Sequence, residues 1–217
     1  GPTSSDGPWT TCTPCLAEVA SAAMNPRANL TGLGGWRPED SARTHTGYRR
    51  LPEMFDFYVR PEMYDEYPFR RFGHVPGYFG FPWGGMEHQT ITSLGGFDEY
   101  LIAHELAHMW WGDMITCNDF HHIWLNEGFA RYCEVLWLEA FYGPSYGRAW
   151  LDRLWNESWI GPLRDPEFLF GSTVYNKGAW VLWQLRQVMG RESLHTAMRN
   201  YVMDPRLRFG PVFVEDF

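Results

Sequence analysis

The sequence contains no apolar run long enough to cross a membrane, and it does not open with a signal-peptide pattern. Basic residues are also in short supply, with 18 Lys and Arg against 26 Asp and Glu, a formal net charge of −8. Nucleic-acid binders usually carry a basic patch. We therefore expect no membrane span and no nucleic-acid partner, while a cytoplasmic and an exported location both remain open.

Cysteine is scarce, and the four residues are Cys12, Cys15, Cys117 and Cys133. Cys12 and Cys15 form a C-x-x-C, a spacing found in zinc knobs and redox sites. No second C-x-x-C follows, and no βαβ pattern surrounds this one. A local disulfide or two free thiols is therefore the simpler interpretation of the pair.

The chain has 217 residues, which suggests one domain, and 12 tryptophans are available for its core. Residues 1–45 are rich in Gly, Pro, Ser, Thr and Ala and lack clean periodicity, so we expect an irregular N-terminal segment or tail. The composition of the sequence changes near Tyr48, and residues 46–217 are expected to form the folded domain.

Within that domain the patterns predict short strands first and helices afterwards, which indicates an α+β fold. We expect strands at residues 53–59 and 86–94, and helices at residues 61–72, 98–111, 123–142, 145–159, 174–189 and 192–203. On the helix at 174–189, Val181, Leu182, Leu185 and Val188 form a stripe expected to lie in the core.

Residues 104–108 read H-E-L-A-H, within the helix predicted at 98–111. A helix turns about 100° per residue, so His104 and His108 lie on one face and can converge on one ion. Glu105 lies at the edge of that face, where its carboxylate can reach a water on the ion without being a ligand. We predict that Glu105 is the general base.

A third ligand is available in Glu127, separated from His108 by eighteen residues and placed early in the next predicted helix. Two His and one Glu leave a fourth position for water, as in catalytic zinc sites. We therefore expect one zinc ion per chain. A metzincin would need Gly and His where this chain has Trp111 and Met114, and the glutamate ligand places the chain with the gluzincins.

Four motifs, in this order along the chain, resemble those of the aminopeptidase N and leukotriene hydrolase family. They are GGMEH at residues 84–88, HELAH at 104–108, WLNEGFARYCE at 124–134 and STVYNKGAWVL at 172–182. His88 departs from the Asn that ends the family's strand motif, a variant shared by a similar bacterial branch. The resemblance implies a thermolysin-like zincin catalytic domain at residues 46–217, truncated at its C-terminus and separated from other domains of a longer parent chain.

The resemblance also implies roles for particular residues. Tyr175 is expected to stabilise the oxyanion, and Glu87 to bind the free amino terminus of a peptide substrate. Gly85 and Met86 belong to the same substrate-binding strand. These residues, with Glu105, imply a zinc aminopeptidase that removes N-terminal residues from peptides through a metal-activated water. An endopeptidase of the same fold and a truncated zinc-binding domain with little or no activity remain alternatives.

Several neighbouring residues have less specific predictions. Glu134 lies two helical turns after Glu127, and we expect its carboxylate to accept a hydrogen bond from a ligand histidine. Asp113 is expected to cap its helix, and His121 and His122 to lie on a surface or loop rather than on the metal. The aromatic residues before Met86 are candidates for a side-chain pocket or for the core, namely Tyr78, Phe79, Phe81 and Trp83.

Overall fold

The computed structural model describes residues 10–11, 35–36, 46–76, 84–156, 159 and 161–217. Of the predicted N-terminal segment it describes two short strands, β1 (Thr10–Thr11) and β2 (Gly35–Trp36), which pair antiparallel. The other residues of that segment, including Cys12 and Cys15, lie outside the described residues. The aromatic residues at 78, 79, 81 and 83 lie outside them too.

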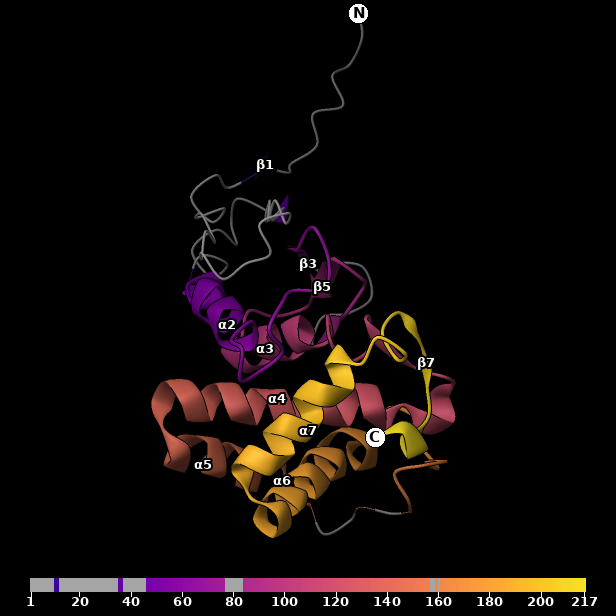
Figure 1. The fold of residues 1–217 in the computed structure, drawn as a ribbon. Helices are drawn as coiled ribbons and strands as arrows, with labels where there is room; N and C mark the ends of the chain where they lie inside the picture. Colours follow the sequence, from indigo (N-terminus) through magenta and orange to yellow (C-terminus); the bar gives the residue numbers. More distant parts are fainter. Residues whose placement is uncertain (1–9, 12–34, 37–45, 77–83, 157–158, 160) are drawn as a thin grey trace, which may run out of the picture.

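Short strands precede the helices, as the α+β prediction requires (Figure 1). The larger sheet has the order β3-β5-β4, formed by β3 (Gly73–Pro76), β5 (Ile91–Leu94) and β4 (Gly85–Met86). β3 pairs with β5 in parallel, and β4 pairs with β5 antiparallel. β4 is therefore an edge strand of this sheet. The single strand predicted at 86–94 is instead two strands, β4 and β5, joined by a turn. The chain turns between them because Thr90 adopts a φ of 71°.

Helix α4 (Trp124–Tyr142) lies at the centre of the helical part. In Figure 1 it crosses the molecule below α3 (Glu99–Ala107) and above α5 (Pro144–Leu154) and α6 (Gly178–Met189). Fifteen of its nineteen residues are buried, and a helix buried all round must be covered on every side. This central position fixes the residues of α4 relative to three other helices.

Segment 53–59 is a helix and not the predicted strand. It belongs to α2 (Leu51–Tyr58), which has Pro52 in its first turn and buries Met54, Phe55, Phe57 and Tyr58. These positions are one and three to four residues apart, so they lie on one helical face. The strand prediction missed this period because the aromatic residues favour strands when read one by one.

Segment 61–72 is not the predicted helix, and most of it consists of turns and bends. Pro68 lacks the N–H that a helix interior needs, and Asp65 has a φ of 70°. The turns bury Tyr64 and Tyr67 against Trp110, with ring centroids 5.4 and 5.7 Å from the indole. Burial of these large rings outweighs the local helix pattern.

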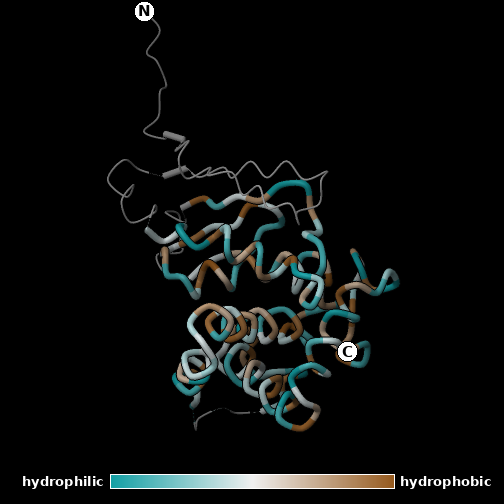
Figure 2. Tube along the Cα trace, turned by 60° about the vertical axis from the view of Figure 1, so that its left-hand side comes forward, coloured by the Kyte–Doolittle hydropathy of each residue, from teal (hydrophilic) through white to brown (hydrophobic). Residues whose placement is uncertain are grey.

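The remaining helices follow the predicted order. α7 (Arg191–Met203) matches the expected segment, whereas α5 ends at Leu154, five residues before its predicted end, and α3 ends at Ala107, four residues before its own. Residues 173–177 form a π-helix, η4 (Thr173–Lys177), ahead of α6. Figure 2 shows brown and teal stretches following one another around the turns of the helices, as expected for helices with one buried side. The prediction that the apolar stripe on α6 lies in the core is partly wrong, since Leu182 is fully buried but Val188 is 85% exposed.

Shorter elements complete the described chain. β6 (Ile115–Cys117) and β7 (Gly210–Val212) pair in parallel, and two 3₁₀-helices lie at η3 (Phe120–His122) and η5 (Val214–Asp216). Cys117 and Cys133 are buried free thiols. None of the helices that the structure describes is both long and apolar enough to span a membrane.

Candidate metal centre and active site

A cavity of about 760 Å³ opens between the edge strand β4, helices α3 and α4, and η4. Its wall contains every residue that the sequence assigns to metal binding, catalysis or substrate binding: Gly85, Met86, Glu87, His104, Glu105, His108, Glu127 and Tyr175. These residues come from four elements spread over about ninety positions of the chain. The fold thus brings the predicted site residues together in one place.

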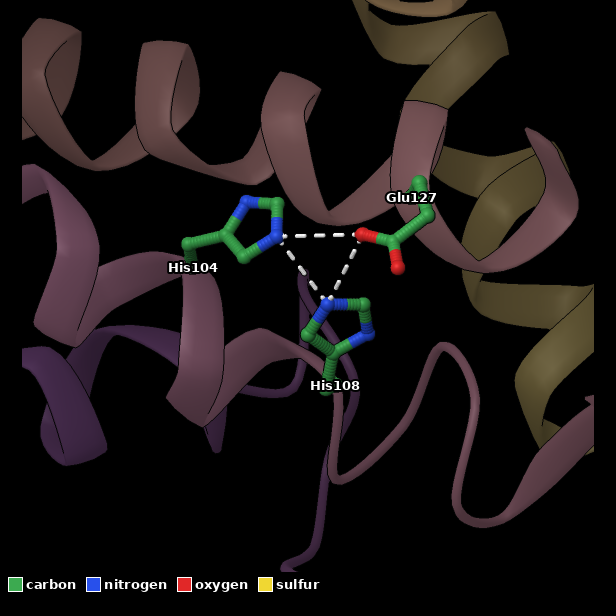
Figure 3. Close-up of side chains that lie close together, drawn as sticks. All are labelled: His104, His108 and Glu127. Carbon is green, nitrogen blue, oxygen red and sulfur yellow. Dashed lines mark hydrogen bonds and ion pairs between the residues drawn. The ribbon is translucent and has the colours of Figure 1, made fainter. Parts of the chain in front are cut away.

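The three predicted metal ligands converge on one point (Figure 3). His104 Nε2 and His108 Nε2 are 3.0 Å apart, and each lies 3.2 Å from Glu127 Oε2. Ligands at about 2.0–2.1 Å around a tetrahedral zinc ion are separated by about 3.3 Å. The triangle of donor atoms therefore has the size that one zinc ion requires.

The outer nitrogens of both imidazoles are already engaged. His104 Nδ1 donates to Glu134 Oε1 at 2.8 Å, and His108 Nδ1 donates to the Trp111 carbonyl oxygen at 2.8 Å. In the neutral rings Nε2 then carries a lone pair and no proton. Two lone pairs and a carboxylate oxygen face each other in a buried place, an arrangement that a cation stabilises.

Burial and charge act in opposite directions on the donor set. Burial opposes the charged form of His104, but hydrogen bonds with Glu127 and Glu134 outweigh it and raise the pKa of His104. Burial would also raise the pKa of Glu127, yet the charge that His108 carries when it is protonated without a metal, and hydrogen bonds with both histidines in that state, lower it. The site therefore keeps Glu127 ionised and attracts positive charge.

Glu134 has no exposed surface and accepts hydrogen bonds from three side chains. His104 donates to Oε1, Arg131 Nη1 donates to Oε1 at 2.8 Å and to Oε2 at 3.1 Å, and Trp150 Nε1 donates to Oε2 at 2.9 Å. Its contact with His104 is the one expected from the sequence. The sequence prediction missed Arg131 and Trp150. The spacing of Arg131, four residues after Glu127 and three before Glu134, would have placed it beside them on the same helix. Trp150 lies on another helix, so no such spacing could have revealed it.

Glu105 lies beside the triangle and outside it. Its side chain is buried, its Oε2 has no hydrogen-bond partner among the described residues, and burial raises its pKa to about 7. Gly85 provides the space, because a Cβ at that position would lie 2.3 Å from Glu105 Oε1. The edge strand and the carboxylate are therefore packed directly against each other.

Glu87 follows β4 and is half-buried in the same cavity wall. Carboxylate oxygens of Glu87 and Glu105 and a ring nitrogen of His108 all lie within 4.8 Å of one another. A second carboxylate thus stands next to the proposed base. His88, the residue that departs from the family motif, is exposed and lies outside the cavity lining.

Tyr175 approaches from the other side, on the π-helix η4. Its ring stacks on His104 with centroids 6.0 Å apart and an angle of 19° between the planes. Burial raises the pKa of Tyr175, and the charge of Glu127 and a side-chain hydrogen bond with it raise that pKa further. Tyr175 therefore stays protonated and able to donate a hydrogen bond.

The nearby histidines are separate from the triangle. The predicted surface position is correct for His121, which is exposed and pairs with Asp165. It is wrong for His122, which is buried and whose Nδ1 accepts a hydrogen bond from the Val214 N–H at 3.1 Å. Neither belongs to a metal-binding group of described residues. For Asp113, burial raises the pKa to about 7, and its backbone N–H donates to the His108 carbonyl oxygen at 3.0 Å, at the end of α3.

Comparison with known proteins places this geometry in a family. Residues 98–209 match the family described as "Peptidase family M1 domain", and this range is just over half of the 217 residues. The chain belongs to peptidase family M1. The matched range contains His104, Glu105, His108, Glu127 and Tyr175. The predicted family resemblance is therefore confirmed.

Two relatives show how much of their length the M1 chain covers. It is 27% identical over 208 residues to leucine aminopeptidase 2 of Ajellomyces capsulatus, covering 85% of this chain and 33% of that protein. It is 29% identical over 208 residues to a leukotriene A-4 hydrolase homolog of Botryotinia fuckeliana, covering 85% of this chain and 31% of that protein. The chain thus spans about a third of the length of these relatives.

A solved structure supports the fold of the M1 chain. It resembles an M1 zinc metallopeptidase of Deinococcus radiodurans bound to a Tyr-Ser-Ala substrate, with a TM-score of 0.68 and 26% identity. The match covers 77% of this chain and 39% of that one. The predicted α+β zincin fold is confirmed, and family M1 together with the triangle of donor atoms implies a catalytic zinc ion.

Proposed function

We propose that this chain is the catalytic part of a zinc-dependent aminopeptidase, which removes N-terminal residues from peptides. The observation that carries the proposal is the position of Glu87, whose carboxylate stands beside Glu105 and His108 in the same cavity. A carboxylate that is neither ligand nor base is available there for a substrate ammonium. Membership of a peptidase family supports peptides as the substrate class.

His104, His108 and Glu127 hold the zinc ion in this proposal, and Glu134 orients His104 through its Nδ1–H. When bound, zinc supplies Lewis acidity, which makes water more acidic and a carbonyl carbon more electrophilic. Glu134 fixes the tautomer in which His104 Nε2 is free to bind metal, as carboxylates around zinc histidines commonly do.

Glu105 accepts a proton from the attacking water and passes it to the leaving amine. Burial raises its pKa to about 7, and the positive charge of a bound ion favours the ionised form that accepts a proton. Tyr175 donates a hydrogen bond to the oxygen of the scissile carbonyl as negative charge develops there. Gly85 and Met86 offer the backbone of an edge strand, with which an extended peptide can pair.

Glu87 decides whether this chemistry acts at the end of a peptide or in its interior. Its carboxylate pairs with the ammonium of the first residue, and this contact places the first peptide bond at the zinc site. A blocked amine cannot make the pair. We therefore expect hydrolysis of leucyl p-nitroanilide and of free-amino peptides, with little hydrolysis of their N-acetylated counterparts.

The variant Glu87→Ala is expected to reduce kcat/KM on free-amino substrates by about a hundredfold. The difference in kcat/KM between free-amino and N-acetylated substrates should therefore become smaller. Removing one partner of a buried charge pair costs about 3–5 kcal/mol, and the lower value applies to a half-buried carboxylate. Each 1.4 kcal/mol is about tenfold in kcat/KM. The measurement compares kcat/KM on both substrate forms for the wild type and the variant.

The neighbouring variant His88→Ala is the matched control, since His88 is exposed and outside the cavity lining. It should leave the preference for free amines unchanged. Wild-type protein that cleaves N-acetylated peptides internally as fast as it releases N-terminal residues would falsify the aminopeptidase proposal and indicate an endopeptidase. Zinc-loaded wild type without any turnover would indicate a zinc-binding domain that has no activity.

The variant Tyr175→Phe is expected to lower kcat by about 10²–10³-fold, the usual effect of removing one oxyanion donor. KM should change less than kcat, because the hydrogen bond strengthens in the transition state. The phenyl ring can still stack on His104, so zinc content should remain that of the wild type. Steady-state kinetics and metal analysis check both expectations, and an effect on KM alone would assign Tyr175 to substrate binding.

A further inference from the structure

Two glycines face each other where α4 crosses the segment that carries Tyr175. Gly128 directly follows Glu127 on α4, and Gly178 begins α6, three residues after Tyr175. A Cβ at Gly178 would lie 2.8 Å from the Cα of Gly128, and a Cβ at Gly128 would lie 3.0 Å from the Cα of Gly178. Real Cβ atoms almost never come closer than 3.0 Å to another heavy atom, so the two backbones touch here.

The surroundings of this contact leave no room for a methyl group. A Cβ at Gly128 would also lie 3.2 Å from the Val174 carbonyl oxygen and 3.3 Å from Trp124 Cε3. Val174 is fully buried and belongs to η4, next to Tyr175. Backbone atoms and a packed indole cannot move aside as a flexible side-chain end can. A methyl group on either glycine must therefore push η4 away from α4.

The position of Tyr175 depends on that separation. Its ring lies over His104, and the Arg131 guanidinium carbon is 5.6 Å from the ring centroid. Arg131 and the proposed metal ligand Glu127 are both on α4. The π-helical turn that holds Tyr175 is a rare conformation that often occurs at functional sites. Its distance from α4 sets the distance from the tyrosine to the metal-binding residues.

We infer that Gly128 and Gly178 are positioning residues, which hold the π-helix η4 against α4 and so place the Tyr175 hydroxyl for its hydrogen bond to the substrate. This inference rests on the proposed peptidase function. Misplacing a catalytic group by about 1 Å can cost on the order of a hundredfold in rate. An added methyl group at the crossing would shift Tyr175 by a distance on the order of 1 Å, the misplacement that such a rate loss requires.

The test is Gly178→Ala, alone and combined with Tyr175→Phe. We expect the single variant to keep its zinc, to lower kcat by roughly tenfold to a hundredfold and to change KM little. In the Tyr175→Phe background the same substitution should cause almost no further loss, because the hydroxyl that it displaces is already absent. An equal loss in both backgrounds would overturn the inference, since the glycine would then act independently of Tyr175.

Gly147→Ala is the matched control, because it crowds a different helix crossing on the same α4. A Cβ at Gly147 would lie 2.7 Å from Glu139 Cβ and 2.9 Å from the Val135 carbonyl oxygen. The Glu139 end of this crossing lies about three helical turns beyond Glu127. We expect this variant to lower the melting temperature while kcat stays close to that of the wild type. A loss of kcat equal to that of Gly178→Ala would assign both effects to general destabilisation and overturn the inference.

A readout without turnover keeps the inference separate from the proposed function. With 3-fluorotyrosine incorporated at position 175, the ¹⁹F resonance should move in Gly178→Ala and stay in place in Gly147→Ala. An unmoved resonance in Gly178→Ala would overturn the inference even in an active enzyme. If the wild type is inactive but the resonance is displaced in Gly178→Ala, the proposed function is refuted and the positioning of Tyr175 stays supported. If Gly178→Ala does not fold, Gly128→Ala tests the same contact from the α4 side, where the nearest atom to the added Cβ would lie 3.0 Å away rather than 2.8 Å.

Discussion

The variant Glu105→Gln is expected to lower kcat by about 10²–10⁴-fold, the range that positioned general acid–base groups contribute, and to leave zinc content unchanged. Glutamine has nearly the size of glutamate and fits into the space that Gly85 leaves. It cannot accept a proton, so both proposed transfers are lost. Zinc stays because Glu105 lies outside the triangle of His104, His108 and Glu127.

The environment of Glu105 suits a group that accepts a proton and then releases it. Its carboxylate is buried, and burial raises its pKa to about 7. The positive charge of a bound ion favours the ionised form and moves the pKa down again. The same carboxylate can then take a proton and release it during one turnover.

The matched control is Glu99→Gln, on the same helix. Glu99 accepts hydrogen bonds from Trp137 Nε1 and the Tyr142 hydroxyl, each at 2.8 Å, and lies outside the cavity lining. Replacing the Glu99 carboxylate should reduce the stability of the fold and leave kcat near the wild-type value. The measurements are kcat at saturating substrate and zinc per chain by metal analysis. Loss of zinc in Glu105→Gln would show that Glu105 is a ligand and not the base.

The convergence of the three proposed ligand atoms could be predicted from the sequence because its geometry is mostly local. His104 and His108 are four apart on one helix, and helical spacing alone places their rings on one face. The second helix was predicted at 123–142 and lies at Trp124–Tyr142. Glu134 follows from the same periodicity. Only the distance between α3 and α4 is a tertiary property, and the triangle closes once they pack together.

The parts that could not be predicted depend on contacts between distant segments. The turns at 61–72 replace a helix because Tyr64 and Tyr67 gain burial against Trp110. Trp150 donates to Glu134 from α5, which no local spacing reveals. Val188 fits the apolar stripe of α6 by period, yet it is 85% exposed, because a period shows which residues share a face and not what covers it.

The variant His108→Ala is expected to lose zinc and, with it, essentially all turnover. His108 Nε2 is one corner of the triangle, 3.0 Å from His104 Nε2 and 3.2 Å from Glu127 Oε2. Two protein ligands remain without it, fewer than the three of a catalytic zinc site. Its Nδ1 hydrogen bond to the Trp111 carbonyl oxygen is also lost, so some loss of stability accompanies the loss of metal.

Chelation distinguishes these two effects. A ligand that binds only the folded state raises its stability, so removing zinc from the wild type should lower the melting temperature, and returning zinc should restore it. His108→Ala should respond to neither treatment. His121→Ala is the control, because His121 is exposed and pairs with Asp165 away from the triangle, and it should behave as the wild type. The ligand assignment fails if His108→Ala retains about one zinc per chain, and the zinc site itself fails if folded wild type contains none.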